Sequence, residues 1–253
     1  MSGHNKWSSI KHKKAAADAK RGKIFSRLAK EITLAAKEGG GDPELNPRLR
    51  TAISSAKDVN MPNDNIDRAI KKGTGELEGG VLEELSYEGY APGGVAVLVT
   101  ALTDNRNRTA ASIRTYFTRH NSSLAGSNAV AWQFHRKARF VVEGEAADEE
   151  RLLELLLEGG AEVEDLTVED GEAEILAPPE AFGDLAELLE NAEVPISQSS
   201  VTMIPETTVE VADAASGRQI LRLIEELEDD EDVQEVYTNF EMSDELMESL
   251  ASE

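Results

Sequence analysis

The segment 138–204 decides the fold class, because strand and helix patterns alternate there in a complete order. It reads ARFVV at 138–142, DEERLLELLLE at 148–158, EVEDLTV at 162–168, EAEILA at 172–177, PEAFGDLAELLEN at 179–191 and PISQSSVTMI at 195–204. The second and fifth stretches place leucines three and four residues apart, which predicts helices, and the others predict short strands. An Asp170-Gly171 turn separates the two middle strands. The order is strand–helix–strand–strand–helix–strand, which is the ferredoxin-like order.

A related alternation occurs on both sides of this segment. The expected strands are 85–90 and 95–102, which the turn at 91–94 joins as a hairpin, and 129–134, 207–211 and 233–240. One helix follows the second of these strands and another precedes the last, so together they predict a second unit of similar topology. We therefore expect an α+β, multidomain protein, with an acidic ferredoxin-like domain at 136–205 inserted into a discontinuous α+β domain formed by 81–135 and 206–253.

Residues 1–80 predict a basic arm followed by a three-helix domain. Apolar residues recur at helical spacing over 23–38, and Gly39-Gly40-Gly41 ends that pattern. Asn46-Pro47 has the sequence of a helix start, and Asn63 is the expected cap of a third helix that ends at Gly73.

Composition excludes several classes of protein. Apolar residues make up 40% of the 253-residue chain and charged residues 30%, which suits folded domains. The chain has no cysteine, which excludes disulfides, zinc–thiolate sites and iron–sulfur clusters. We found no apolar run approaching the roughly 18 residues of a membrane-spanning helix, and the lysine-rich start lacks the apolar core of a secretory signal. We expect a cytoplasmic protein without a membrane partner.

Charge is distributed very unevenly along the chain. The net charge is −23, from 26 basic and 49 acidic residues. Residues 1–37 hold ten bases and two acids, whereas residues 140–253 hold three bases and 35 acids. Because screening limits electrostatic influence to about 8–10 Å, a polyanion would experience the local basic patch rather than the net charge.

The basic arm and the helix after it predict a nucleic-acid-binding surface, since lysines and arginines neutralise phosphates without reading sequence. Trp7 and His12 could stack on bases or sugars. The alternative is a solvated tail with no fixed partner. The nucleic-acid-binding candidates are Lys6, Trp7, Lys11, His12, Lys13, Lys14, Lys20, Arg21, Lys23, Arg27 and Lys30.

Two loops are secondary candidates. The Met61-to-Asn65 loop is first a helix junction, and we hypothesise that Met61 and Asn65 also face the ligand. The loop containing Asn105, Arg106 and Arg108 could bind phosphate at a helix start or be an ordinary capping loop, and the sequence does not choose.

No catalytic, metal or cofactor site is expected, because the four histidines lack metal-ligand or triad spacing. The acidic run 225–232 lacks calcium-loop spacing and is interpreted as a solvated helix end. The acidic half could also recruit a basic protein partner or keep nucleic acid on one face of the molecule.

Several long motifs resemble the YebC/PmpR family. They are GHNKW at 3–7, KHKK at 11–14, DAKRGK at 18–23, GGGDP at 39–43, NPRL at 46–49, MPNDNI at 61–66, YEGYAPGGVA at 87–96, TDNRNRT at 103–109, GS at 126–127 and WQF at 132–134. Asn5 stands where many relatives have Ser. The resemblance spans essentially the whole chain and implies three domains, with the third inserted in the second.

The resemblance also implies a non-enzymatic regulator of gene expression. Some family members are described as DNA-binding transcriptional regulators. Others are described as ribosome-associated translation activators that aid the synthesis of proline-rich stretches. We therefore expect duplex DNA or ribosomal RNA as the partner, with an acidic protein-binding adaptor as a further alternative.

Overall fold

A computed structural model describes residue 7 and residues 17–78, 82–169 and 171–251. The chain divides into two compact units. One unit contains Trp132–Thr208, and the other contains Trp7–Ala131 together with Val209–Glu253. Within the described residues, we found no helix with the length and apolar character needed to cross a bilayer.

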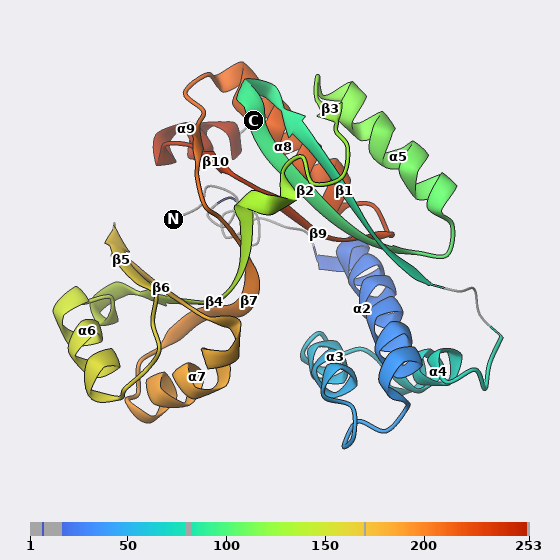
Figure 1. Ribbon diagram of the computed structural model, residues 1–253, viewed down its shortest axis with the longest axis horizontal. Coiled ribbons are helices and arrows are strands. Elements are labelled where there is room, and N and C mark those ends of the chain that lie inside the picture. The colour runs from blue at the N-terminus through green and yellow to red at the C-terminus, as the bar shows by residue number, and fades with distance from the viewer. Residues whose placement is uncertain (1–6, 8–16, 79–81, 170, 252–253) are drawn as a thin grey trace. The chain divides into compact units, whose positions relative to one another are not determined.

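Three helices open the larger unit: α2 (Ala17–Gly39), α3 (Pro47–Asp58) and α4 (Asn63–Gly73) (Figure 1). Asn46 caps α3, because its Oδ1 accepts the Leu49 N–H at 3.1 Å. The expected cap at Asn63 is wrong: Pro62 holds the cap position of α4 and gives no side-chain hydrogen bond.

The three helices share one apolar core, built from one face of each. Its fully buried members include Ile32 of α2 and Leu49 of α3, and Ile66 of α4 packs with them. The end of α4 approaches α2 so closely that a Cβ on Gly73 would lie 2.3 Å from the Thr33 carbonyl oxygen. The contact therefore requires glycine, and it fixes the face that α4 presents.

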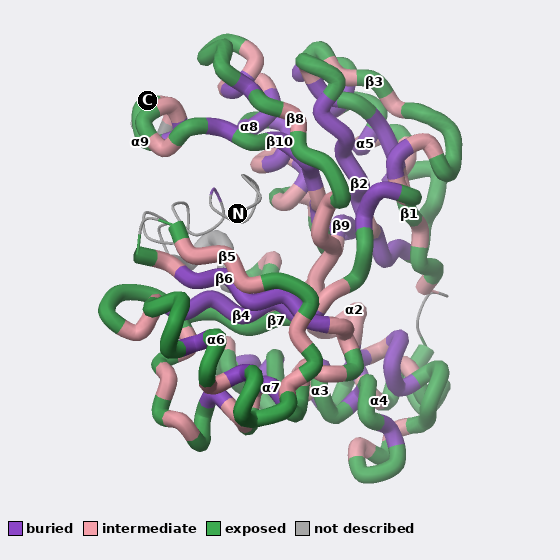
Figure 2. The backbone as a smooth tube through the Cα atoms, turned by 60° about the vertical axis from the view of Figure 1, so that its left-hand side comes forward, coloured by how far each residue is buried: buried purple, intermediate pink, exposed green. Residues whose placement is uncertain are grey.

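The rest of the larger unit consists of an antiparallel sheet, a short parallel strand pair and the packed helices α5, α8 and α9. Its elements are β1 (Glu83–Ala91), η1 (Pro92–Gly94), β2 (Val95–Thr103), α5 (Arg106–Arg119), β3 (Ser123–Leu124), β8 (Val209–Glu210), α8 (Ala214–Glu228), β9 (Val233–Thr238), β10 (Phe240–Glu241) and α9 (Asp244–Ala251). The main sheet has the order β3-β1-β2-β9, and β8 pairs separately with β10. Phe117 of α5, Ile220 of α8 and Val97 of β2 belong to one buried core, and Figure 2 shows the buried run along β2.

Two expected strands of this unit differ in the structure. Residues 129–133 do not form a strand, because the Glu88 carboxylate accepts the backbone N–H groups of Asn128, Val130 and Ala131 at 2.7–2.8 Å. The expected hairpin is confirmed, since β1 is nine residues long and pairs with β2 along its whole length. The strand expected at 207–211 is only two residues long and pairs outside the main sheet.

The smaller unit follows the predicted order closely. After the short helix η2 (Ala131–Gln133), its elements are β4 (Phe134–Glu143), η3 (Gly144–Ala146), α6 (Glu149–Glu158), β5 (Asp165–Glu169), β6 (Glu172–Ala177), η4 (Pro179–Ala181), α7 (Phe182–Asn191) and β7 (Ile196–Pro205). The sheet is antiparallel with the order β5-β6-β4-β7, which is the ferredoxin-like arrangement. Both α6 and α7 cover one face of this sheet (Figure 1), where Phe140, Leu156 and Leu189 form the core. The predicted α+β, multidomain class is confirmed.

Candidate nucleic-acid interface

Three basic side chains of α2 form a stripe that contacts acidic residues of β9 and of the segment between α8 and β9. Lys23 Nζ lies 3.2 Å from Asp229, and Arg27 lies 3.3 Å from Glu235. Lys30 Nζ lies 2.6 Å from Asp232. The three cations are four and three residues apart, which places them on one side of the helix.

This contact changes the interpretation of both segments. The acidic run at 225–232 is not only a solvated helix end, because two of its last four residues hold α2 through Lys23 and Lys30. These two lysines and Arg27, all predicted phosphate ligands, are engaged within the chain.

Asp232 is the centre of this contact and is 4% exposed. Its carboxylate accepts hydrogen bonds from Lys30 at 2.6 Å, Arg108 at 2.8 and 3.0 Å, Thr109 at 2.7 Å and Thr103 at 3.1 Å. Burial raises the pKa of Asp232, but the hydrogen bonds from Lys30, Arg108 and Thr109 outweigh it and lower the pKa to about 2. Asp232 therefore carries a negative charge that two cations balance.

The loop before α5 serves mainly as a helix cap. Asn105 Oδ1 accepts the Arg108 N–H at 3.1 Å, and the Arg108 guanidinium binds Asp232 and Asp104. Arg106 is exposed, with its Nε 3.7 Å from Glu83. Of the two interpretations that the sequence leaves open, the structure shows the capping one for Asn105 and Arg108.

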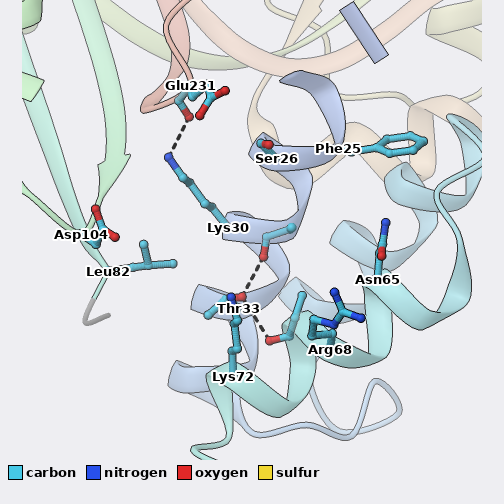
Figure 3. A pocket seen from close by; sticks show the side chains of 12 residues that line it. Phe25, Ser26, Lys30, Thr33, Asn65, Arg68, Lys72, Leu82, Asp104 and Glu231 are labelled. Atoms are coloured by element: carbon cyan, nitrogen blue, oxygen red, sulfur yellow. Dashed lines mark hydrogen bonds between the residues drawn. The ribbon is translucent and has the colours of Figure 1, made fainter. Parts of the chain in front are cut away.

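A cavity of about 400 Å³ lies beside this contact, between α2, α4 and the loops that carry Asp104 and Glu231 (Figure 3). Its charged and amide-bearing lining residues are Lys30, Asn65, Arg68, Lys72, Asp104 and Glu231. Lys30 reaches across it to donate a hydrogen bond to the Glu231 carbonyl oxygen at 2.8 Å. Asn65 lines this cavity, and its contact with a ligand stays a prediction.

Arg68 and Lys72 are the residues that the sequence prediction missed. They come from α4 with Asn65, and the spacing of three and four residues puts all three on one side of that helix. Within the described part of the chain, neither Arg68 nor Lys72 forms an ion pair, and neither does the adjacent, exposed Lys71. The sequence does carry a signal for them, as two bases four residues apart on a helix whose apolar face is evident from periodicity.

Two aromatic and apolar candidates are buried. Met61 is 4% exposed and packs in the helical core, so its side chain does not line the cavity. Trp7 is 5% exposed and belongs to the core of the α+β sheet. Stacking on a base requires an exposed ring face, so the expected stacking role of Trp7 is corrected to packing.

The remaining arm residues are not placed. Lys6, Lys11, His12, Lys13 and Lys14 lie outside the described residues. Lys20 and Arg21 belong to α2, but only their backbone is described. Their phosphate-binding role stays a prediction. Across the described ranges, we found no group of three or more His, Asp or Glu side chains that could hold a metal ion.

Comparison with known families covers nearly the whole chain. Residues 5–76 match the family model described as the TACO1/YebC protein N-terminal domain, and residues 82–240 match the model of the TACO1/YebC second and third domain. The chain belongs to the TACO1/YebC family. The resemblance drawn from the sequence motifs is confirmed.

Relatives in this family match over their full length. The chain is 54% identical over 252 residues to a "Probable transcriptional regulatory protein" of Natranaerobius thermophilus, which covers 98% of this chain and 100% of the relative. It is 53% identical over 249 residues to a protein of the same name from Desulfosudis oleivorans, with 98% and 100% covered. The crystal structure of a conserved hypothetical protein from Aquifex aeolicus matches with a TM-score of 0.78 and 48% identity, over 93% of this chain and 96% of that one.

Proposed function

We propose that this TACO1/YebC-family chain is a non-enzymatic, nucleic-acid-binding regulator of gene expression that acts in the cytoplasm. The names of its relatives support a regulatory role. The basic arm and the cationic side of α4 supply the chemistry for contact with phosphates.

The observation that carries the proposal is the pair of cations on α4. In a chain of net charge −23, acidic partners are abundant, and Lys23, Arg27 and Lys30 of α2 form ion pairs with them. Arg68 and Lys72 instead line a cavity without an ion pair among the described residues. A phosphate group would neutralise them, and the nearby Asn65 amide could donate a further hydrogen bond.

Duplex DNA is the partner that the relatives' names favour, and ribosomal RNA is the second candidate. The first 37 residues contain eight lysines and only two arginines. Lysine acts as a point charge on phosphate, whereas arginine is the common reader of guanine in the major groove. This composition favours contact with a structured RNA backbone, as in a ribosome-associated translation factor that aids the synthesis of proline-rich stretches. A protein-binding adaptor that uses the acidic half is a third, less supported role.

The proposal is tested with a double variant, Arg68→Ala with Lys72→Ala. We expect it to bind duplex DNA and RNA more weakly, and the slope of log affinity against log salt to become shallower by about 1.4–1.8, because two phosphate interactions are removed. Arg151→Ala, which removes an exposed base of α6 in the smaller unit, is the control. Equal affinities and slopes for the double variant and the wild type would contradict the assignment of this surface.

A further inference from the structure

Helix α5 lies in a stretch of the chain that lacks acidic residues. From Asn105 to Val142 the sequence contains seven bases and no Asp or Glu, in a protein with 49 acidic residues. Arg114 of α5 is exposed and forms no ion pair in the described ranges. The helix therefore presents positive charge in a chain that is otherwise strongly acidic.

The end of α5 meets two of the few bases of the acidic half. After residue 139 the bases are Arg151, Arg218 and Arg222 alone. Arg218 and Arg222 of α8 line a hollow of about 520 Å³ together with Arg119 and His120 from the end of α5. Two of the three bases in this half are thus gathered at one place, beside a third arginine.

The hollow has one acidic lining residue, Glu226, and two groups of α5 already bind it. Arg119 Nη1 lies 2.8 and 2.9 Å from its two carboxylate oxygens, and His120 Nε2 lies 3.3 Å from one of them. Burial raises the pKa of Glu226, but the hydrogen bonds from Arg119 and the close approach of His120 outweigh it, so the pKa is lowered. The charge of Glu226 is therefore balanced from α5. Arg218 also lowers the pKa of the neighbouring Asp213, so Arg222 is the base of the hollow that supplies exposed positive charge.

The two arginines of α8 lie close enough together to contact the same nucleic-acid backbone. Arg218 and Arg222 are four residues apart on α8, which places their Cβ atoms about 5–6 Å from each other. Arg222 is exposed and has no ion-pair partner among the described residues. Guanidinium groups bind phosphate through two parallel hydrogen bonds, which lysine cannot do.

We propose that this hollow, the α5–α8 arginine cluster of Arg119, Arg218 and Arg222, binds backbone phosphates of a nucleic acid as a second contact beside the α4 surface. The inference rests on the proposed function and extends it. Helix α5 has 14 residues and connects the two places. It starts next to Asp104, which lines the cavity beside α4, and it ends at Arg119, which lines the hollow. Its length of about 21 Å corresponds to about six base pairs of duplex at 3.4 Å each. A nucleic acid that contacts both places must therefore be longer than that.

The test compares two variants with opposite expected effects in a full-length chain. Arg218→Ala with Arg222→Ala should make the salt slope for a 20-base-pair DNA or a 20-nucleotide RNA shallower by about 1.4–1.8, which lowers affinity about 25- to 60-fold at 0.1 M salt. Glu226→Gln should release Arg119 and make the slope steeper by about 0.7–0.9. Loss of folding cannot explain a gain in affinity, and Arg151→Ala again serves as the control.

Each contrary outcome has a distinct meaning. If the α4 double variant weakens binding but the two α5–α8 variants leave it unchanged, the cluster is not a phosphate site and the proposed function stands. If the α8 variant loses only binding to a poly-glutamate peptide, the cluster recognises acidic protein and the inference is overturned. If the wild type binds neither DNA nor RNA, the proposed function and this inference both fail.

Discussion

Replacing Asp232 with Asn should destabilise the larger unit, because Asp232 joins α2 to the α+β sheet. The carboxylate is 4% exposed and receives charge-assisted hydrogen bonds from Lys30 and Arg108. Its pKa of about 2 lies below the ordinary value of 3.8, a difference that corresponds to about 2.4 kcal/mol. Because the Arg108 side chain is 54% exposed and can be rehydrated, we expect Asp232→Asn to lower the free energy of unfolding by about 1–2 kcal/mol at pH 7.

The stabilisation that Asp232 provides should depend on pH. A lowered carboxyl pKa stabilises the folded state above the unfolded-state pKa of about 4, and the contribution disappears as the pH falls to about 2. The difference between the wild type and Asp232→Asn should therefore shrink to about half at about pH 3.

Fluorescence can report on this unit selectively. Trp7 is buried in the α+β core whereas Trp132 is 64% exposed, so urea unfolding is followed by Trp7 emission in a Trp132→Phe background. A difference below about 0.5 kcal/mol at pH 7, or one that is the same at pH 7 and pH 3, would refute the reasoning.

Three other perturbations have defined expected results. Gly73→Ala should lower stability by about 1–3 kcal/mol in thermal unfolding, because the new Cβ would lie 2.3 Å from the Thr33 carbonyl oxygen; an unchanged midpoint would mean that α4 shifts freely. Residues 136–205, expressed alone, should unfold cooperatively in urea, since they contain a complete strand and helix order; a gradual, non-cooperative transition would count against these domain boundaries. Replacing Lys13, Lys14, Lys20 and Arg21 with Ala should make the salt slope of nucleic-acid binding shallower by about 0.7–0.9 for each phosphate interaction removed and leave the unfolding midpoint unchanged, whereas an unchanged affinity would leave the arm as a solvated tail.

The sequence predicts the smaller unit well because the information there is local. Its strands and helices follow one another with clear periodicity, and its sheet order follows from that sequence of elements. The hairpin of β1 and β2 is also local, and its prediction is confirmed. The rest of the neighbouring sheet is harder to predict. The side chain of Glu88, some 40 residues away, removes the backbone donors that a strand at 129–133 would need.

In the candidate site too, features set by nearby residues can be predicted from the sequence, and features set by distant residues cannot. The basic character of α2 is visible in the sequence, but the acids that bind Lys30 and Arg27 lie more than 200 residues further along the chain. Charge counting alone therefore assigns these residues to a ligand. By contrast, the spacing of Arg68 and Lys72 on one helix is local information that could have indicated these cavity-lining cations.

Co-sedimentation of the full-length chain with ribosomes, at low and high salt and in competition with duplex DNA, tests the central claim most directly. If the cations of the arm and of α4 bind phosphates, the chain sediments with ribosomes at about 50 mM salt and is released by about 500 mM salt. Duplex DNA displaces the chain from ribosomes if DNA is the preferred partner, and fails to displace it if ribosomal RNA is. A chain that stays in the supernatant at low salt, and that binds neither ribosomes nor DNA there, would contradict the account.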